Sequence, residues 1–583
     1  MTDKTARVLL PALLALVVLI NAWTFTSLHT PRTYGHDALT RGVNALATLH
    51  IEGPSGLVHF FRAQGLVVDF QWTHLVGAAL LAGSGNSWRA MVMAPTLFLL
   101  LLLTALFFIG AKLHSKAAGL AVLAAALVCP GIVGWSRYYA SLTANMALVA
   151  LAVCLLLYSE HGRRWVWAAA AGAVTALAVK SGEAVGEAFL NGLTILPVAA
   201  LLLAPALRSG RRRGLVGAAC FVAALALLLD WPWLTHMTPY LWREAGGGLA
   251  NALPTQTVAA PWAAYAIAFF THNVFFEIAV IALAGTIWFT RRPDVSRYAI
   301  VAWWLVPLVA LSFLDKKNFL YLATLTPALP ILAGVALVEG LEHLAAPRRR
   351  RLALVAWIAA CSALFILNAL WPSWGHQRIE RGRTRYAGAF QLDVPNLVPE
   401  PPPAADDQTE ALVEAALACN PQSVLLLGDT ARPVDRMLGA PEQVVRFLFF
   451  LPLDGPPLID LFFAVGHAHD PNGVEAALAA AWEPAPDAFV LLDDFADAHE
   501  DVFRAKVSRG LLDAIQGTLP RLPVTLPRQA IDPVAAQITD RLPPGSFDPA
   551  VGRRFRLPFP SEPGVPFTTA RLVCADVGAE VTP

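Results

Sequence analysis

Charged residues are scarce in this sequence. Asp, Glu, Lys and Arg make up 15% of the 583 residues, whereas hydrophobic residues make up 56%. An ordinary soluble domain has about 25% charged residues, so this composition indicates a polytopic membrane protein. The formal net charge is only +1, and the overall charge therefore favours no nucleic-acid partner and no acidic one.

Two motifs are also missing. The first apolar run, residues 7–27, is not followed by a clear small-residue cleavage site, so we expect a retained anchor and not a cleaved signal peptide. No G-x-G-x-x-G loop opens a predicted helix in the C-terminal part of the chain, which gives no sign of a dinucleotide site there.

Cysteine is rare as well, with six residues in the chain. Four of them lie in predicted membrane spans, where cysteine is usually a small apolar filler. The other two, Cys419 and Cys574, could form a disulfide in an oxidising compartment. The sequence leaves that pairing open, because it does not give the geometry of the two residues.

Long apolar runs fill the first part of the chain. A helix needs around 20 apolar residues to cross a bilayer core about 30 Å thick, and this rule predicts about eleven transmembrane helices. The predicted spans are 7–27, 89–111, 117–134, 143–158, 165–181, 188–207, 214–231, 264–290, 298–314, 318–340 and 352–371. We therefore expect residues 1–371 to form a transmembrane domain.

Residues 372–583 differ in composition, with more Asp and Glu and with Pro-rich stretches. Short apolar runs predict buried strands at 423–427, 458–465 and 488–492. Helical spacing occurs at 408–418, 474–482 and 499–516. The expected fold class is thus a polytopic α-helical membrane protein with a C-terminal α/β extracytoplasmic domain.

Basic residues gather in every second gap between the predicted spans. Because Lys and Arg resist translocation, these gaps are expected to be cytoplasmic. The residues concerned are Lys4, Arg7, Lys112, Lys116, Arg163, Arg164, Arg208, Arg211–Arg213, Arg291, Arg292 and Arg348–Arg351. The N-terminus is then cytoplasmic and the C-terminal domain periplasmic or extracellular. The Ala-, Leu- and Arg-rich composition favours a bacterial inner membrane.

One step departs from this alternation. Lys316 and Lys317 follow Asp315 on the predicted outer side. Two ammonium groups at the outer ends of adjacent helices could clamp a phosphate, with Asp315 as a counter-ion. The alternative is that both lysines extend to lipid headgroups.

An acidic residue, Asp37, lies just past the first predicted span, where it follows His36. It is placed to act as a functional carboxylate at the outer membrane face. It is equally well placed to cap a helix over the following residues, 38–50. Both interpretations stay open on position alone.

The order of several motifs resembles the GT-C superfamily, the integral-membrane glycosyltransferases that use polyprenyl-phosphate sugars, such as protein O-mannosyltransferases and aminoarabinose transferase. The resemblance covers roughly residues 1–345. It is carried by His36-Asp37-Ala38, Phe70–Leu75, Pro130 with Ser136-Arg137-Tyr138, Ala176–Lys180, and Lys317–Leu322 with Pro327. The family usually has Asp-Glu where this chain has Asp37-Ala38, and a second acid near the position of Asn145.

The resemblance implies transfer of a sugar from a polyprenyl-phosphate or pyrophosphate donor to an acceptor hydroxyl at the outer face. Asp37 would be the general base. Lys316, Lys317, Lys180, Arg137 and Arg243 would bind the lipid phosphate. His36, His74, Tyr138, Glu183 and Tyr321 are candidates for contacts with the sugar or the acceptor.

The partners expected from the resemblance are the lipid-linked donor, membrane lipids and a glycan, lipid or protein acceptor, with no nucleic acid. No metal ligand and no cofactor is assigned, and a divalent metal stays compatible with the motifs.

Two other functions are compatible with the sequence. A transporter or lipid flippase would place ionisable groups near the middle of spans, and Glu277, near His272, is the best candidate for such a group. A non-catalytic envelope assembly protein would use its external domain to bind partners.

Overall fold

The computed structural model of the chain describes the membrane helices and the core strands of the C-terminal part. The described residues are 3–27, 72–83, 93–137, 141–181, 185–210, 212–229, 266, 269–270, 274, 276–292, 294–312, 319–344, 346–370, 408–418, 423–428, 444–451, 458–461, 488–492, 553–558 and 567–574. They fall into two compact units, one with the long helices and one with the strands. Each unit is described by itself.

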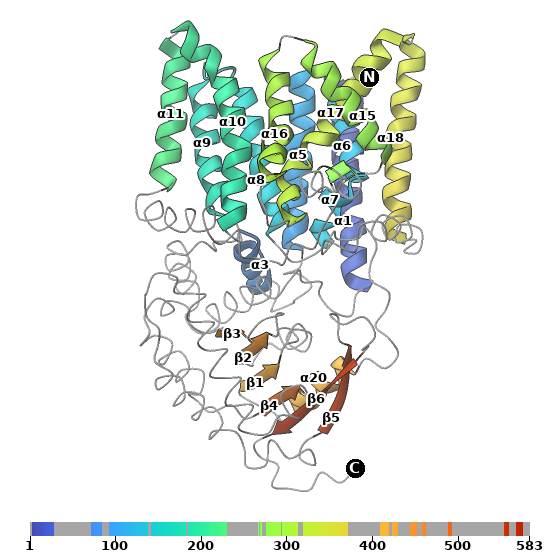
Figure 1. The fold of residues 1–583 in the computed structure, drawn as a ribbon. Helices are drawn as coiled ribbons and strands as arrows, with labels where there is room; N and C mark the ends of the chain where they lie inside the picture. Colours follow the sequence, from blue (N-terminus) through green and yellow to red (C-terminus); the bar gives the residue numbers. More distant parts are fainter. Residues whose placement is uncertain are drawn as a thin grey trace. The chain divides into compact units, whose positions relative to one another are not determined.

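The helical unit is a bundle of helices that run side by side (Figure 1). Its elements are α1 (Asp3–Ser27), the first half of α3 (Trp72–Gly83), α5 (Ala94–Leu113), α6 (Lys116–Leu127), α7 (Pro130–Val133), η1 (Trp135–Arg137), α8 (Leu142–Tyr158), α9 (Trp165–Lys180), α10 (Val185–Ser209), α11 (Arg212–Leu229), α15 (Phe276–Thr290), α16 (Val295–Ser312), η4 (Phe319–Leu325), α17 (Ala328–Leu344) and α18 (Pro347–Leu370).

Within the described part of the chain, seven helices are long and apolar enough to cross a membrane. They are α1, α5, α10, α11, α16, α17 and α18. Four shorter apolar helices, α6, α8, α9 and α15, lie within further predicted spans. The protein is therefore a polytopic α-helical membrane protein, as the composition predicts, and the number of eleven crossings stays a prediction.

Two predicted spans are interrupted in the structure. The span predicted at 117–134 ends as an α-helix at Leu127, and Pro130 begins the short helix α7. The span predicted at 318–340 begins as the 3₁₀ helix η4, and α17 starts only after Pro327. Proline lacks an N–H and fits the first turn of a helix, which explains why a new helix starts at or just after each proline.

Small residues let several helices approach each other closely. A Cβ atom at Gly172 of α9 would lie 2.2 Å from the backbone oxygen of Phe221 in α11. A Cβ atom at Gly334 of α17 would lie 2.4 Å from the backbone nitrogen of Val122 in α6. In membrane proteins such contacts matter because helix association depends on close van der Waals packing.

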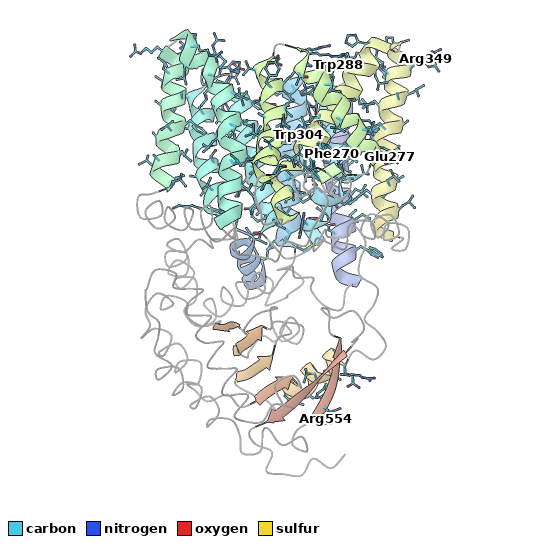
Figure 2. All side chains as sticks on the ribbon, viewed as in Figure 1. Phe270, Glu277, Trp288, Trp304, Arg349 and Arg554 are labelled. Atoms are coloured by element: carbon cyan, nitrogen blue, oxygen red, sulfur yellow. The ribbon has the colours of Figure 1, made fainter. Side chains whose placement is uncertain are left out.

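The turns that carry the basic residues lie at one end of the bundle, here called the basic end. Lys112, in the last turn of α5, donates to Glu160 in the α8–α9 turn at 3.2 Å. This hydrogen bond holds the pKa of Glu160 below its usual range. A ring nitrogen of His161 lies 2.8 Å from the carbonyl of Leu202 in α10. Figure 2 shows Arg349, at the start of α18, at the same end.

The other end of the bundle is here called the opposite end. There α1, α9 and α18 finish, α8 and α10 begin, and η1 and η4 lie between longer helices. The predicted outer segments adjoin these elements in the sequence.

The second unit contains a mixed sheet. Its described elements are α20 (Thr409–Ala418), β1 (Ser423–Gly428), β2 (Val444–Leu451), β3 (Leu458–Leu461), β4 (Ala488–Leu492), β5 (Arg553–Pro558) and β6 (Phe567–Cys574). The strand order is β3-β2-β1-β4-β6-β5. β1 pairs in parallel with β2 and β4, and the other pairs are antiparallel.

One cysteine of this unit, Cys574 at the end of β6, is disulfide-bonded. Cys419 lies outside the described residues, so its pairing with Cys574 stays a prediction. The cysteines of the membrane helices, Cys129, Cys154, Cys220 and Cys361, are free thiols.

The close contact at Gly172 gives a test of the packing. We expect Gly172→Ala to lower the midpoint of thermal unfolding in detergent, because backbone and not a flexible side chain occupies the space that the methyl group needs. Overpacking of this kind typically costs about 1–3 kcal/mol. Gly340→Ala is the matched control, since a Cβ atom there meets nothing within 4 Å. Equal midpoints for the two variants would contradict the close packing of α9 on α11.

Candidate functional site

At the opposite end, a buried asparagine joins three elements. Asn21 of α1 donates from its Nδ2 to Thr96 Oγ1 of α5 at 3.0 Å and to Ser136 Oγ of η1 at 3.1 Å. Ser136 Oγ in turn donates to the carbonyl of Val133 at 2.7 Å. The side chains of Asn21, Thr96 and Ser136 are fully buried. These bonds fix the backbone of η1, whose last residue is Arg137.

A second buried polar group surrounds the C-terminal turn of α9. Asn191 of α10 donates from its Nδ2 to the carbonyl of Ala178 at 2.6 Å. Ser181 Oγ lies 2.6 Å from Asn145 Oδ1 of α8 and donates to it. The last carbonyls of a helix have no helical partner, and Asn191 supplies one from α10, while Asn145 of α8 accepts from the residue that follows α9. The last residue of α9 is Lys180, which is partly buried.

A third buried contact holds η4. Trp303 of α16 donates from its Nε1 to the carbonyl of Thr324 at 2.9 Å, and the Trp303 side chain is fully buried. The helix η4 begins two residues after Lys317 and contains Tyr321. Both α8 and α10 contact η4, and α8 also contacts η1 and α9. The segments that end at Arg137 and at Lys180, and the segment that follows Lys317, therefore meet around α8.

The structure describes the backbone of four predicted site residues. Arg137 ends η1, Lys180 ends α9, Tyr321 lies in η4, and His74 lies in the first turn of α3. It brings the elements of the first three together around α8. The other predicted site residues, His36, Asp37, Tyr138, Glu183, Arg243, Lys316 and Lys317, lie outside the described residues.

Glu277, the residue that best suits a transport path, lies in the first turn of α15 and is exposed. Figure 2 shows it near the middle of the bundle, at a height similar to that of Phe270 and Trp304. An acidic side chain is favourable in the first turn of a helix, because the helix dipole is positive there. This position gives Glu277 a structural explanation that needs no transport path.

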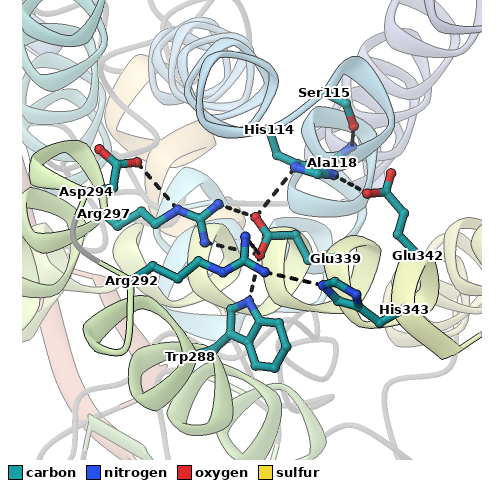
Figure 3. Close-up of polar contacts among 10 residues, drawn as sticks. All are labelled: His114, Ser115, Ala118, Trp288, Arg292, Asp294, Arg297, Glu339, Glu342 and His343. Carbon is teal, nitrogen blue, oxygen red and sulfur yellow. Dashed lines mark hydrogen bonds and ion pairs between the residues drawn. The ribbon is translucent and has the colours of Figure 1, made fainter.

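A large charged cluster occupies the basic end and centres on Glu339 of α17 (Figure 3). Arg297 of α16 donates to both carboxylate oxygens of Glu339, with 3.1 Å from Nη1 to Oε2. Trp288 of α15 donates from its Nε1 to the same Oε2 at 2.6 Å. Glu339 is 2% exposed and Arg297 is 8% exposed. Burial of two charges is tolerated here because each is paired and hydrogen-bonded.

Two histidines and a second arginine extend this cluster. His114 Nδ1 lies 3.5 Å from Glu339 Oε1, and His114 Nε2 lies 3.0 Å from Glu342 Oε2. Arg292 Nη1 lies 3.5 Å from Glu339 Oε2, and its Nη2 lies 3.3 Å from His343 Nε2. The cluster thereby joins the α5–α6 turn, the α15–α16 turn and α17. Its arrangement is that of an interhelical clamp whose acids are already occupied.

The Glu339 cluster and the buried amides are not among the sites that the sequence predicts. Arg297 and Glu339 each stand in a largely apolar helix, and an ionisable residue in such a helix is a signal that could have revealed the pair. Nothing in the sequence marks Asn21 or Asn191. Within the residues that the structure describes, no group of three or more His, Cys, Asp or Glu side chains could hold a metal ion.

The Glu339 cluster predicts a specific loss of stability. Glu339→Gln removes the buried carboxylate that pairs with Arg297 and leaves it only the exposed Asp294, 3.4 Å from its Nε. Breaking a buried pair in this way costs about 3–5 kcal/mol. Glu342→Gln is the matched control, because Glu342 is 43% exposed and exposed pairs contribute about 0–1 kcal/mol. We expect denaturant or thermal unfolding in detergent to show a large loss for the first variant only. Similar losses would argue against the clamp.

No protein-family model matches the sequence, and no curated protein matches it. Solved structures do. The chain is similar to ArnT from Cupriavidus metallidurans bound to undecaprenyl phosphate, with 14% identity, a TM-score of 0.51, and coverage of 85% of this chain and 94% of that chain. The apo state of the same protein gives 15% identity and a TM-score of 0.50, with the same coverage. The oligosaccharyltransferase of Archaeoglobus fulgidus in complex with zinc and sulfate gives 13% identity, a TM-score of 0.48, and coverage of 86% and 70%.

The likeness to ArnT establishes the fold. The chain has a polytopic membrane fold similar to that of ArnT. At these identities the likeness concerns the fold alone.

Proposed function

We propose that the protein transfers a sugar from a polyprenyl-phosphate donor to an acceptor hydroxyl at the opposite end of the helix bundle. The observation that carries the proposal is the meeting of η1, the end of α9 and η4 around α8, because Arg137, Lys180 and the Lys316-Lys317 pair belong to or adjoin these segments. The fold supports it, since ArnT, which shares this fold, binds undecaprenyl phosphate.

The reaction replaces one C–O bond by another. The acceptor oxygen attacks the anomeric carbon of the sugar, the bond from that carbon to the phosphate oxygen breaks, and the lipid phosphate leaves with the electron pair. Asp37 takes the proton of the acceptor hydroxyl as general base. The donor and the acceptor hydroxyl are the two substrates, and no oxidant or reductant is needed for this balance.

The proposed cations stabilise the charge that develops on the departing phosphate. A Lys ammonium is a point charge and can follow a phosphate that is free to rotate, whereas the Arg guanidinium can bind two phosphate oxygens at once. Lys316, Lys317 and Lys180 have the first role, and Arg137 and Arg243 the second. Fixed donors of this kind are most effective where water is excluded.

Two arguments support an extracytoplasmic location for this site. Basic residues in short loops favour the cytoplasm, so the basic end is assigned to the cytoplasm and the opposite end to the outside. The strand unit follows α18, which ends at the opposite end, and it contains the disulfide-bonded Cys574. Stable disulfides are typical of oxidising compartments. Both arguments fit a bacterial inner membrane with a cytoplasmic N-terminus.

The proposal predicts a loss of transfer in Asp37→Asn. The assay uses proteoliposomes with an undecaprenyl-phosphate sugar as donor and with total membrane lipid and envelope extract as acceptor source. We expect the rate at which undecaprenyl phosphate is released to fall about 10²- to 10⁴-fold. The exposed Glu342 provides a matched carboxylate control as Glu342→Gln. Full turnover by a folded Asp37→Asn protein would overturn the assignment of the base. Movement of the intact labelled donor across the membrane, without cleavage, would instead identify a flippase.

A further inference from the structure

The C-terminal turn of α9 is held mainly by one side chain from another helix. The carbonyl of Ala178 accepts from Asn191 Nδ2 at 2.6 Å, whereas the backbone N–H of Ser181 reaches the same carbonyl only at 3.4 Å. Ser181 Oγ lies within 2.9 Å of that carbonyl but closer, 2.6 Å, to Asn145 Oδ1. Since a hydroxyl has one proton, its bond to Asn145 leaves Asn191 as the principal donor to the turn.

The bond also limits how the turn can move. Asn191 is fully buried and belongs to the second turn of α10, so its amide is fixed by its own helix. Ala178 lies two residues before Lys180 in the last turn of α9. A helix end that is held by a buried side chain cannot fray or rotate without breaking that bond. The position of the Lys180 backbone therefore depends on Asn191.

Stability alone does not account for an asparagine at this position. The amide oxygen of Asn191, Oδ1, is buried and has no hydrogen-bond partner among the described residues. The same is true of Ser141 Oγ, just before α8. A buried polar atom without a partner costs about 1–3 kcal/mol. A leucine, which has the same branching and number of heavy atoms, would avoid this cost, so the amide is explained by what its Nδ2 holds in place.

We infer that Asn191 is a positioning residue that acts through the Ala178 carbonyl to hold Lys180 where it binds the phosphate of the lipid donor. The inference rests on the proposed function, because it takes Lys180 as a phosphate ligand. A lysine that is displaced by about 1 Å interacts less strongly with a bound anion. Misplacement of this size in an active site can lower the reaction rate about 10²-fold. Asn191 itself touches no substrate in this account.

The test is a double-mutant cycle on lipid binding by the full-length protein in detergent. The variants are Asn191→Leu, Lys180→Met and the double variant, and the probes are undecaprenyl phosphate and undecaprenol. The dissociation constant of undecaprenol divided by that of undecaprenyl phosphate isolates the recognition of the phosphate from that of the lipid tail. We expect each single variant to reduce this ratio about tenfold, as the loss of a charge-assisted hydrogen bond would, and the double variant to equal Lys180→Met.

The control is Thr194→Val, which removes a buried hydroxyl one turn further along α10 whose bond stays within that helix. We expect Thr194→Val to keep the wild-type ratio. Asn191→Ser replaces Asn191→Leu in the cycle if the leucine variant does not fold, because the shorter side chain also loses the bond to Ala178.

Each outcome distinguishes the two proposals. Wild-type protein that binds both lipids equally, or Lys180→Met that keeps the wild-type ratio, would overturn the phosphate site and the proposed function that depends on it. A wild-type ratio in the Asn191 variant would overturn only the positioning role. Losses that multiply in the double variant would also overturn it, because they would mean that Asn191 acts independently of Lys180.

Discussion

The structure depends on how helix ends inside an apolar bundle satisfy their backbone. A carbonyl at such an end has no helical partner and no water, so a neighbouring side chain must supply the hydrogen bond. Ser136, Asn191 and Trp303 supply it at η1, at the end of α9 and at η4. These bonds fix the backbone of the segments that contain Arg137 and Lys180 and of the segment that follows Lys317. The proposed chemistry requires that rigidity.

The two ends of the bundle use polar groups differently. At the basic end, Arg297 and Glu339 satisfy each other's charge, and the surrounding side chains join three helices and a turn. At the opposite end, the described interhelical bonds come from neutral amides, hydroxyls and an indole. Neutral groups fix a backbone without adding a negative charge beside it. An anionic substrate, as proposed for the opposite end, needs such surroundings.

The sequence predicts the class of the fold because membrane crossing demands apolar length, and the spans can be read from runs such as that of α5. Pro130 and Pro327 mark where two predicted spans break. Strands β2, β5 and β6 are not predicted, because Arg446, the arginines of β5 and Arg571 interrupt their apolar pattern. The contacts of Asn21 with Thr96, 75 residues away, could not be predicted, since residue type gives no indication of a distant partner.

The central claim is that the proposed base and the proposed phosphate-binding lysines share one face of the membrane, away from the basic end. Labelling of single cysteines by an impermeant maleimide in sealed, oriented vesicles tests it most directly, with the free cysteines Cys129, Cys154, Cys220 and Cys361 replaced by alanine. The account predicts that Asp37→Cys and Lys317→Cys react from the same face and that Arg349→Cys, at the basic end, reacts from the other. Reaction of residues 37 and 317 from different faces would contradict it.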